Sequence, residues 1–229
     1  MATKAIVSYD DTPNDQDALM LSRVLADAGA ELTLAYVRHT TQSERRREEL
    51  EEHEALALLE RGLLGLDGID AERRVVVSGS TAEGLRWLAD EEEADIVVFG
   101  SDYRTQPGHT APQRSAERLL QGGSAAVALA PAGYRGDGWA RIRTVGLLAE
   151  PGDDAALETA RELAESFGAT VTRDEPRVDL LVVGSRPEAP EGQVMVSALA
   201  ERALQDANSP VLVLPRGVAL RFPALAAAA

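Results

Sequence analysis

Short apolar runs alternate with helical patterns along the first part of the chain. The apolar runs have the length of buried strands, and they cover residues 5–9, 32–37, 75–77, 95–99 and 126–130. Between them, apolar residues recur three and four positions apart, which is the spacing of one helix face. These helical segments cover 13–28, 41 to about 61, a stretch after Ser80, and 115–121. Strands that alternate with helices in this way predict βαβ units and a parallel sheet.

Residues at the ends of the expected helices support their placement. Thr12 and Pro13 have the character of an N-cap and a first helical residue, and Gly29 is suited to ending the same helix. Ser80 and Glu83 have the spacing of a capping box. The first half of the chain is therefore predicted to be one compact five-stranded domain with right-handed crossovers.

The second part of the chain repeats the first. The segment Asp95–Ser101 recurs as Asp179–Ser185, and an Ala-Glu-Arg triplet follows at the same distance beyond each glycine. An apolar strand closes both units, and residues 29–33 match 168–172 upstream. Matches at several equal spacings indicate a tandem duplication.

The second copy is shorter than the first. A helix, a strand and another helix separate Thr33 from Asp95, whereas six residues separate Thr172 from Asp179. Because a parallel crossover needs about a dozen residues, we expect about three parallel strands in the second copy. Residues 169–177 would then form a loop or an irregular edge, and so small a sheet should pack on the first copy.

The predicted fold class is therefore α/β, with tandem doubly wound parallel sheets of five strands in the first copy and about three in the second. The expected boundaries are 1–132 for the first domain, 133–141 for a Gly- and Arg-rich linker, 142–217 for the truncated domain and 218–229 for a C-terminal tail.

The composition and net charge of the chain disfavour several classes of partner. The formal net charge of −15 disfavours nucleic acid and anionic membranes as partners. The chain has no cysteine, no recognisable targeting segment and no apolar run of about 18 residues that could span a membrane. These features together predict a cytoplasmic protein.

No catalytic or metal-binding constellation is evident. His53 and Glu54 begin like the HExxH motif, but Ala57 occupies the position of its second histidine. The serines that follow or end strands, among them Ser8 and Ser185, lack a G-x-S-x-G context. We therefore expect no enzyme activity and no metal site.

Taken in order, several segments resemble the universal stress protein family. They are the acid after the first strand, LTLAYV at 32–37, DIVVFGS at 95–101, the glutamate of the fourth helix and VLVLP at 211–215. The resemblance implies a five-stranded parallel sheet with helices on both faces. It also implies that 126–130 and 211–214 lie side by side and antiparallel, which makes an internal pseudo-dimer. A homodimer and an unidentified protein partner remain open.

Family members that bind ATP carry a loop of the form G-x2-G-x9-G-[ST] after the fourth strand. Glycines there let backbone N–H groups approach phosphate oxygens. In the first copy Gly100 and Ser101 match the motif, but Tyr103 replaces the second glycine. Gln113 and Arg114 stand where the motif has its third glycine and its Ser or Thr.

The resemblance also assigns roles outside this loop. Asp10 fits the acid that holds the ribose, Val37 fits the adenine contact, and the guanidinium groups of Arg104 and Arg114 offer phosphate contacts in place of glycine amides. The implied ligand is ATP or another adenine nucleotide, with Mg²⁺. The predicted site consists of Asp10, Val37, Gly100, Ser101, Arg104, Gln113, Arg114 and Ser115.

Simpler interpretations compete with two of these assignments. Acids such as Asp10 and Asp11 also stabilise the start of a following helix, and Gly100 also suits a strand-end turn. The second copy keeps Gly184 and Ser185 but has Pro187, Ser197 and Ala198 at the later motif positions and Ala149 at the strand-one acid.

The leading functional hypothesis is a non-catalytic stress-response or regulatory protein, with or without an adenine nucleotide bound in its first copy. The alternative is a nucleotide-free scaffold that acts by dimerisation and partner docking. A nucleotide-dependent enzyme is disfavoured because Asp10 to Asp15 contain no glycine and no HxGH motif follows Gly108.

Overall fold

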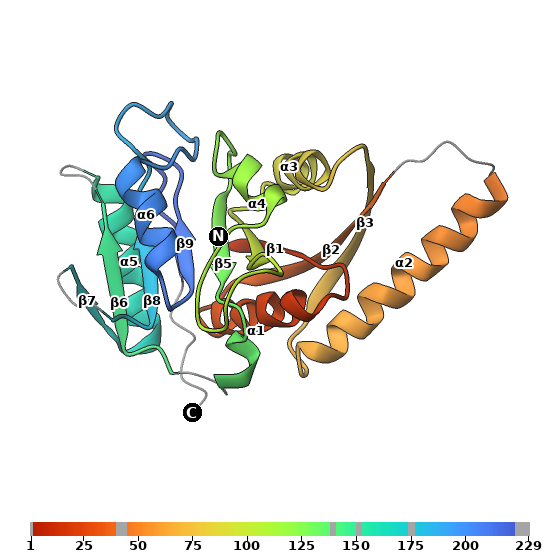
Figure 1. The fold of residues 1–229 in the computed structure, drawn as a ribbon, viewed down its shortest axis with the longest axis horizontal. Coiled ribbons are helices and arrows are strands. Elements are labelled where there is room, and N and C mark those ends of the chain that lie inside the picture. Colours follow the sequence, from red (N-terminus) through yellow and green to blue (C-terminus); the bar gives the residue numbers. More distant parts are fainter. Residues whose placement is uncertain (1, 40–44, 138–140, 150–152, 174–176, 223–229) are drawn as a thin grey trace.

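The structure is a computed structural model that describes residues 2–39, 45–137, 141–149, 153–173 and 177–222. Its strands join into one nine-stranded sheet in the order β3-β2-β1-β4-β5-β9-β8-β6-β7 (Figure 1). The first copy contains β1 (Lys4–Ser8), α1 (Pro13–Asp27), β2 (Glu31–His39), α2 (Arg45–Gly65), β3 (Ala71–Ser78), α3 (Thr81–Glu92), β4 (Ile96–Gly100), α4 (Arg114–Leu119) and β5 (Ala126–Ala130). The second contains β6 (Thr144–Leu148), α5 (Asp154–Phe167), β7 (Thr170–Thr172), β8 (Leu180–Val183), α6 (Ala198–Asp206) and β9 (Val211–Val213).

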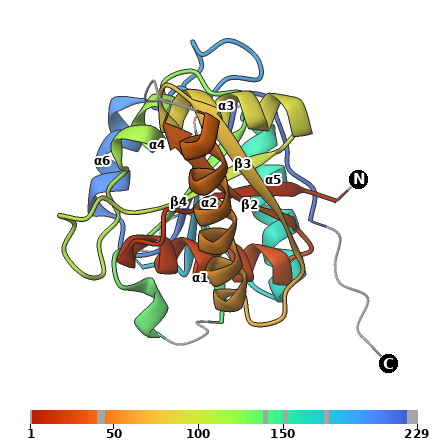
Figure 2. The ribbon, with the colours of Figure 1, turned by 90° about the vertical axis from the view of Figure 1, so that its right-hand side faces the viewer.

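Helices cover both faces of the sheet, and each face has one apolar core that runs through both copies. Side chains of α1, α2 and α5 pack on one face and those of α3, α4 and α6 on the other. Along a strand the layers alternate, so that Val98 joins the first core while Val97 and Phe99 join the second. Only α2 leans outward at the end of the sheet, beside β3 (Figures 1 and 2). The α/β prediction is therefore confirmed.

The two copies meet at their last strands. β5 and β9 pair antiparallel, with Val127 opposite Val213, Ala128 opposite Leu212 and Leu129 opposite Val211. All other strand pairs in the sheet of the described residues are parallel. The expected antiparallel contact between the closing strands is confirmed, and it turns two sheets into one.

Loop contacts repeat across this junction in both directions. The buried Thr110, in the loop after β4, donates from its backbone N to Ala207 O at 3.1 Å and from Oγ1 to Ser209 O at 3.2 Å. In return, Val194 N, in the loop after β8, donates to Gly123 O at 2.9 Å. Each copy therefore holds the long loop of the other, as the two halves of a pseudo-twofold dimer would.

The second copy has four strands, so the prediction of about three is wrong. Residues 170–172 form β7, which pairs in parallel with β6, while β8 pairs with the other side of β6. The length rule for parallel crossovers assumed strands of ordinary length. A three-residue strand needs almost no return path, because Thr172 lies beside Gly146 and β8 starts beside Val145. Residues 174–176 of this connection lie outside the described part.

Other boundaries shift by a few residues. The helix expected to end near Arg61 continues to Gly65, and β3 starts at Ala71 rather than at Val75. Relative to the first copy, the second lacks counterparts of α2, β3 and α3. Of the described helices, none is both long and apolar enough to cross a membrane.

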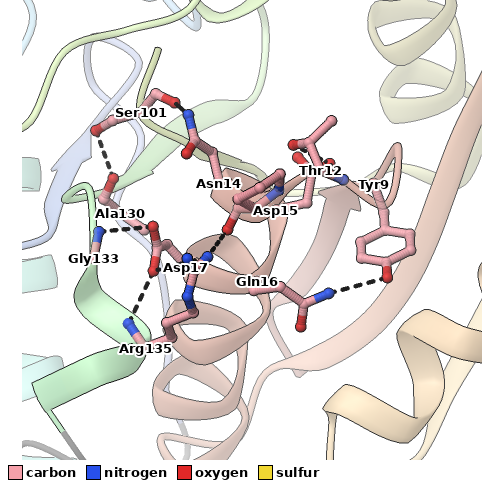
Figure 3. A network of polar contacts seen from close by, with 11 residues as sticks. Tyr9, Thr12, Asn14, Asp15, Gln16, Asp17, Ser101, Ala130, Gly133 and Arg135 are labelled. Atoms are coloured by element: carbon pink, nitrogen blue, oxygen red, sulfur yellow. Dashed lines mark hydrogen bonds and ion pairs between the residues drawn. The ribbon is translucent and has the colours of Figure 1, made fainter. Parts of the chain in front are cut away.

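The linker and the tail are anchored where the structure describes them. Residues 134–137 form a 3-10 helix, η1 (Tyr134–Asp137), whose start is held by the buried Asp17 of α1. The Asp17 carboxylate accepts from Gly133 N at 2.8 Å and from Arg135 N at 2.9 Å (Figure 3). Residues 223–229 lie outside the described part, but Phe222 is buried in the core beside α5.

We predict that Asp17→Ala lowers the free energy of unfolding by about 1–3 kcal/mol, because the backbone N–H groups of Gly133 and Arg135 lose the buried carboxylate that accepts their hydrogen bonds. Urea denaturation measures this loss. The control is Asp70→Ala, which removes the same charge from an exposed side chain and should change stability by less than about 0.5 kcal/mol. Equal effects of the two substitutions would show that Asp17 does not hold η1.

Candidate functional site

The candidate site lies at the carboxyl ends of β1, β2 and β4. The strand order runs outward from β1 in both directions, toward β2 on one side and β4 on the other. In a doubly wound sheet the loops diverge at such a point and leave a crevice outside the strand ends. Asp10 follows β1, His39 ends β2 and Gly100 ends β4.

Asp15 secures the start of α1. Its Oδ2 accepts from the backbone N of Asp10 at 3.0 Å and of Thr12 at 2.9 Å, and from Thr12 Oγ1 at 2.7 Å. Burial raises the pKa of this carboxyl above its ordinary value, although the bonds from Thr12 and Asp10 oppose the rise. The helix-capping role that competed for Asp10 therefore belongs to Asp15.

Asp11 is also committed within the protein. It adopts a left-handed backbone (φ 60°), accepts from Tyr9 Oη at 2.8 Å, and pairs with Arg61 of α2 at 2.9 Å. The bonds from Tyr9 and Arg61 lower its pKa. Burial and the bond to Asp11 raise the pKa of Tyr9 to about 12, and Gln16 Nε2 donates to the same hydroxyl (Figure 3). This network ties the β1–α1 loop to α2.

Asp10 is the acid left available to a ligand. It is exposed, and its carboxylate accepts no hydrogen bond from any described residue. Surrounding protein atoms raise its pKa to about 6 by desolvation, and the charge of Asp15 adds to the rise while that of His39 opposes it. A perturbed carboxyl without an internal partner at a strand-end crevice is typical of a ligand contact.

Gly100 and Gly184 have a packing role in both copies. A Cβ on Gly100 would lie 2.7 Å from the carbonyl carbon of Asn14 and closer still to its oxygen, so only glycine fits beneath the start of α1. A Cβ on Gly184 would meet a carboxylate oxygen of Asp153, the N-cap of α5. The strand-end interpretation of these glycines therefore has a specific cause, which is close approach of the following helix.

Ser101 and Ser185 are buried, and their hydroxyl groups make equivalent hydrogen bonds in the two copies. Ser101 Oγ donates to Ala130 O at 2.7 Å and accepts from Ala111 N at 3.2 Å. Ser185 Oγ makes the same pair of bonds, to Leu214 O at 2.7 Å and from Met195 N at 3.0 Å. Each hydroxyl thus fixes its long loop to the end of its last strand.

Among the other residues predicted for the site, Val37 and Gln113 have structural roles, whereas the two arginines are exposed. Val37 is buried on the α3 side of β2, where its Cγ1 lies 2.8 Å from the Cβ position of Gly84, so its side chain belongs to the core rather than to the crevice. Gln113 is the N-cap of α4. Arg104 and Arg114 are exposed, and Arg104 Nε donates to Tyr103 Oη at 2.7 Å.

Two cavities adjoin His39. One, of about 640 Å³, lies between β2 and α2 and is lined by Tyr36, Arg38, His39, Glu54, Ala55, Ala57, Leu58 and Arg61. The other, of about 260 Å³, is lined by Ser80, Thr81, Ala82, Arg114, Ser115 and Arg118. His39 lines the first, and its Nε2 lies 3.3 Å from Thr81 Oγ1 in the second.

The crevice of the second copy is lined mainly by acidic side chains, unlike the cavities of the first copy. Its cavity, of about 550 Å³, is lined by Asp153, Asp154, Ala155, Glu158, Ser185, Pro187, Glu191, Arg216, Gly217 and Ala219. The only cation among these residues, Arg216, donates to Ala189 O at 2.6 Å. Four carboxylates against one guanidinium disfavour an anionic ligand there.

Sequence reasoning missed three residues of the site. Asn14 Nδ2 donates to Ser101 O at 2.6 Å and joins the first turn of α1 to the loop after β4 (Figure 3). Arg118 was seen only as part of a repeated triplet, although its spacing from Arg114 predicts one shared helix face. His39 was not assigned to the nucleotide site, and no group of three His, Asp or Glu in the described residues could hold a metal.

Comparison with known proteins agrees with this architecture. Residues 1–131 match the family described as Universal stress protein family. The structure of a universal stress protein from Archaeoglobus fulgidus DSM 4304 superposes with a TM-score of 0.71 at 14% identity, covering 95% of this chain and 100% of that one. A functionally unknown protein from Pseudomonas aeruginosa PAO1 gives a TM-score of 0.64 at 13% identity, with 94% and 93% covered. No curated protein matches the chain.

We predict that Gly100→Ala destabilises the protein by at least about 2 kcal/mol, because the new methyl group meets the backbone of α1. Gly184→Ala should cost less, since the group in its way is the movable carboxylate of Asp153. The control is Gly136→Ala, which has open space around the new atom. Chemical denaturation of the three variants gives the order, and an equal loss for Gly136 and Gly100 would contradict the packing role.

Proposed function

This chain belongs to the universal stress protein family, and from that premise we propose that it is a non-catalytic regulatory protein that binds one adenine nucleotide, with Mg²⁺, in its first copy. The absence of cysteine and the net charge of −15 support a cytoplasmic place of action.

The observation that carries the proposal is the pair of cavities that adjoin His39, close to an unpartnered Asp10. The larger cavity is lined by aromatic and aliphatic side chains, Tyr36 and Leu58 among them, and by polar and charged ones, a combination that ligand pockets also have. The smaller one is lined by two arginines and three hydroxyl groups. A nucleotide needs such a succession of surfaces: apolar for the base, a carboxylate for the ribose and cationic for the phosphates.

The proposed base position differs from the one that the sequence implied. Because the Val37 side chain packs under α3, the base would lie on the opposite side of β2, in the cavity between β2 and α2. Asp10 would accept a hydrogen bond from the ribose, and Arg114 would contact phosphate in place of the lost loop glycines.

A single site per chain follows from the difference between the two copies. The second copy has alanine where the first has Arg114, lacks a counterpart of α3, and has four carboxylates in its cavity. The strand registers align Ala149 with Tyr9 rather than with Asp10, so the assignment of Ala149 to the position of the acid after the first strand was wrong. Its contribution would be structural, through the contacts that it makes to Thr110 of the first copy.

A second candidate is a scaffold that binds no nucleotide. It is favoured by one observation: Gly100 and Ser101 have packing and hydrogen-bonding roles that recur in the second copy. Their presence therefore needs no ligand to explain it.

We predict that calorimetric titration of the wild type with ATP and Mg²⁺ gives one site per chain. Arg114→Ala should weaken binding about tenfold, the loss expected for one charged hydrogen bond. Arg202→Ala, on α6 of the second copy, removes the same charge and should leave the affinity unchanged. No binding up to millimolar ATP would contradict the proposed function and leave the scaffold.

We predict that Asp10→Asn stabilises the protein at pH 7.5 and has no effect near pH 4. The folded-state pKa, about 6, lies above the ordinary value of 3.8, so the folded protein binds the proton more tightly than the unfolded chain. Stability contributed by the protonated form is thus lost as the pH rises from about 4 through about 6. Thermal unfolding across this range measures the difference, and a variant less stable than the wild type at pH 7.5 would contradict the assignment.

A further inference from the structure

The long helix α2 is not packed evenly along its length. Among its residues whose side chains the structure describes, Glu52, His53 and Glu54 are exposed, and burial begins with Ala55 and Leu59. Three consecutive exposed residues span more than half of a helical turn, so this turn is not packed against the sheet. The ribbon has the same arrangement, since the start of α2 stands away from β2 and β3 (Figures 1 and 2).

The C-terminal end of α2 is held closely by the elements beside it. A Cβ on Gly62 would lie 2.5 Å from Leu34 Cδ2, a side chain of β2. A Cβ on Gly65 would lie 2.8 Å from Leu19 Cδ1, a side chain of α1. Glycine at both positions lets the helix approach its neighbours, and the ion pair that joins α2 to Asp11 lies at the same end. This end is therefore the fixed point for any movement of α2.

The strand β3 is covered unequally on its two faces. Val76 and Val77 are adjacent and therefore point to opposite faces of the sheet. Val76 packs on the α3 side and is 4% exposed, whereas Val77 is 50% exposed. Val77 faces the same side as Val75, which packs on the core that α2 shares. At its carboxyl end, β3 thus lacks on the α2 side the cover that α3 provides on the other.

The cavity of about 640 Å³ lies between this raised helix and the sheet. One wall comes from β2, and the other consists of residues 54, 55, 57, 58 and 61 of α2. The tilt of α2 therefore sets the width of the cavity. Val77 is paired with Arg38 of the β2 wall, although it does not itself line the cavity. A turn of α2 toward β2 would narrow the cavity, and burial of Val77 would favour that movement.

We propose that α2 is a lid that turns about its C-terminal end and closes on a ligand bound between β2 and α2. The proposal rests on the proposed function, which places the base of the nucleotide in this cavity. A ligand that contacts both walls only in the closed position shifts α2 toward that position. A regulatory protein without catalysis needs a surface that changes when its ligand binds, and the outward-leaning helix supplies one.

The first test measures distances between spin labels. The chain has no cysteine, so introduced cysteines carry the labels at chosen positions only. The test pair is Glu52→Cys on α2 with Arg86→Cys on α3, and the control pair is Leu64→Cys with the same Arg86→Cys. All three side chains are exposed, and Leu64 lies at the fixed end of α2. With ATP and Mg²⁺, we expect pulsed electron paramagnetic resonance to give a shorter distance for the test pair and an unchanged one for the control pair.

The second test uses a residue that only the closed position would bury. Val77→Thr keeps the branched shape, and its half-exposed hydroxyl can contact water while α2 is raised. Closure would remove that hydroxyl from water, so ATP binding should weaken about tenfold in calorimetry. The control is Leu64→Thr, which introduces the same group at a side chain that is 81% exposed and should leave the affinity unchanged. Thermal unfolding verifies that both variants are folded.

Calorimetry on the labelled proteins separates the possible failures. ATP that binds without shortening the distance of the test pair overturns the lid and leaves nucleotide binding intact. Equal shortening of both distances, or equal ATP affinities of Val77→Thr and the wild type, has the same consequence. Absence of ATP binding by the wild type refutes the proposed function together with the lid.

Discussion

The structure depends on the antiparallel pairing of β5 with β9. The edge strand of a sheet exposes backbone N–H and C=O groups that lack hydrogen-bond partners. Here β5 and β9 supply these partners to each other along three register pairs centred on Ala128 and Leu212. Because the strands pair, the apolar layers above and below them also become continuous, and α5 shares one core with α1 and α2. A four-stranded unit whose strands have three to five residues would have little core of its own. Joined to the first copy, it becomes the far end of a larger sheet.

The truncation of the second copy removes much of the candidate site, because residues of α2 and of the start of α3 line the cavities of the first copy. The missing counterparts of α2, β3 and α3 belong to the outer edge, remote from the junction. What the junction needs is retained: the glycine that admits the helix, the serine that clamps the loop and the closing strand. Selection for packing explains these residues in both copies, whereas Asp10, Arg114 and Arg118 have no such explanation within the described contacts. Of the features of the candidate site, Arg114 is replaced by Ala198 in the second copy, and α3 has no counterpart there.

Local patterns predicted most of this fold, and the limits of the prediction have physical causes. The repeat of Asp95–Ser101 predicted the duplication, and the resemblance of the closing strands predicted their pairing. The strand at 170–172 was excluded by a rule on crossover length that a three-residue strand does not have to obey. The separate roles of Asp10, Asp11 and Asp15 could not be predicted. Carboxylates close together in the sequence differ only in the hydrogen-bond donors that surround each of them in the fold. The family resemblance placed Val37 at the end of the second strand, in contact with the base. In the structure β2 continues to His39, and the Val37 side chain is buried in the core.

The internal pairing of the two copies also changes how the assembly responds to its surroundings. A dimer of separate subunits dissociates on dilution and can exchange subunits with related chains. Here the partner is covalently attached, so its effective concentration stays high at any expression level. Because β9 already pairs with the edge of β5, the last strand of another chain cannot pair there. The protein is therefore not expected to form mixed dimers with single-domain relatives. Its two halves can therefore diverge in sequence without a symmetric counterpart to restrain them.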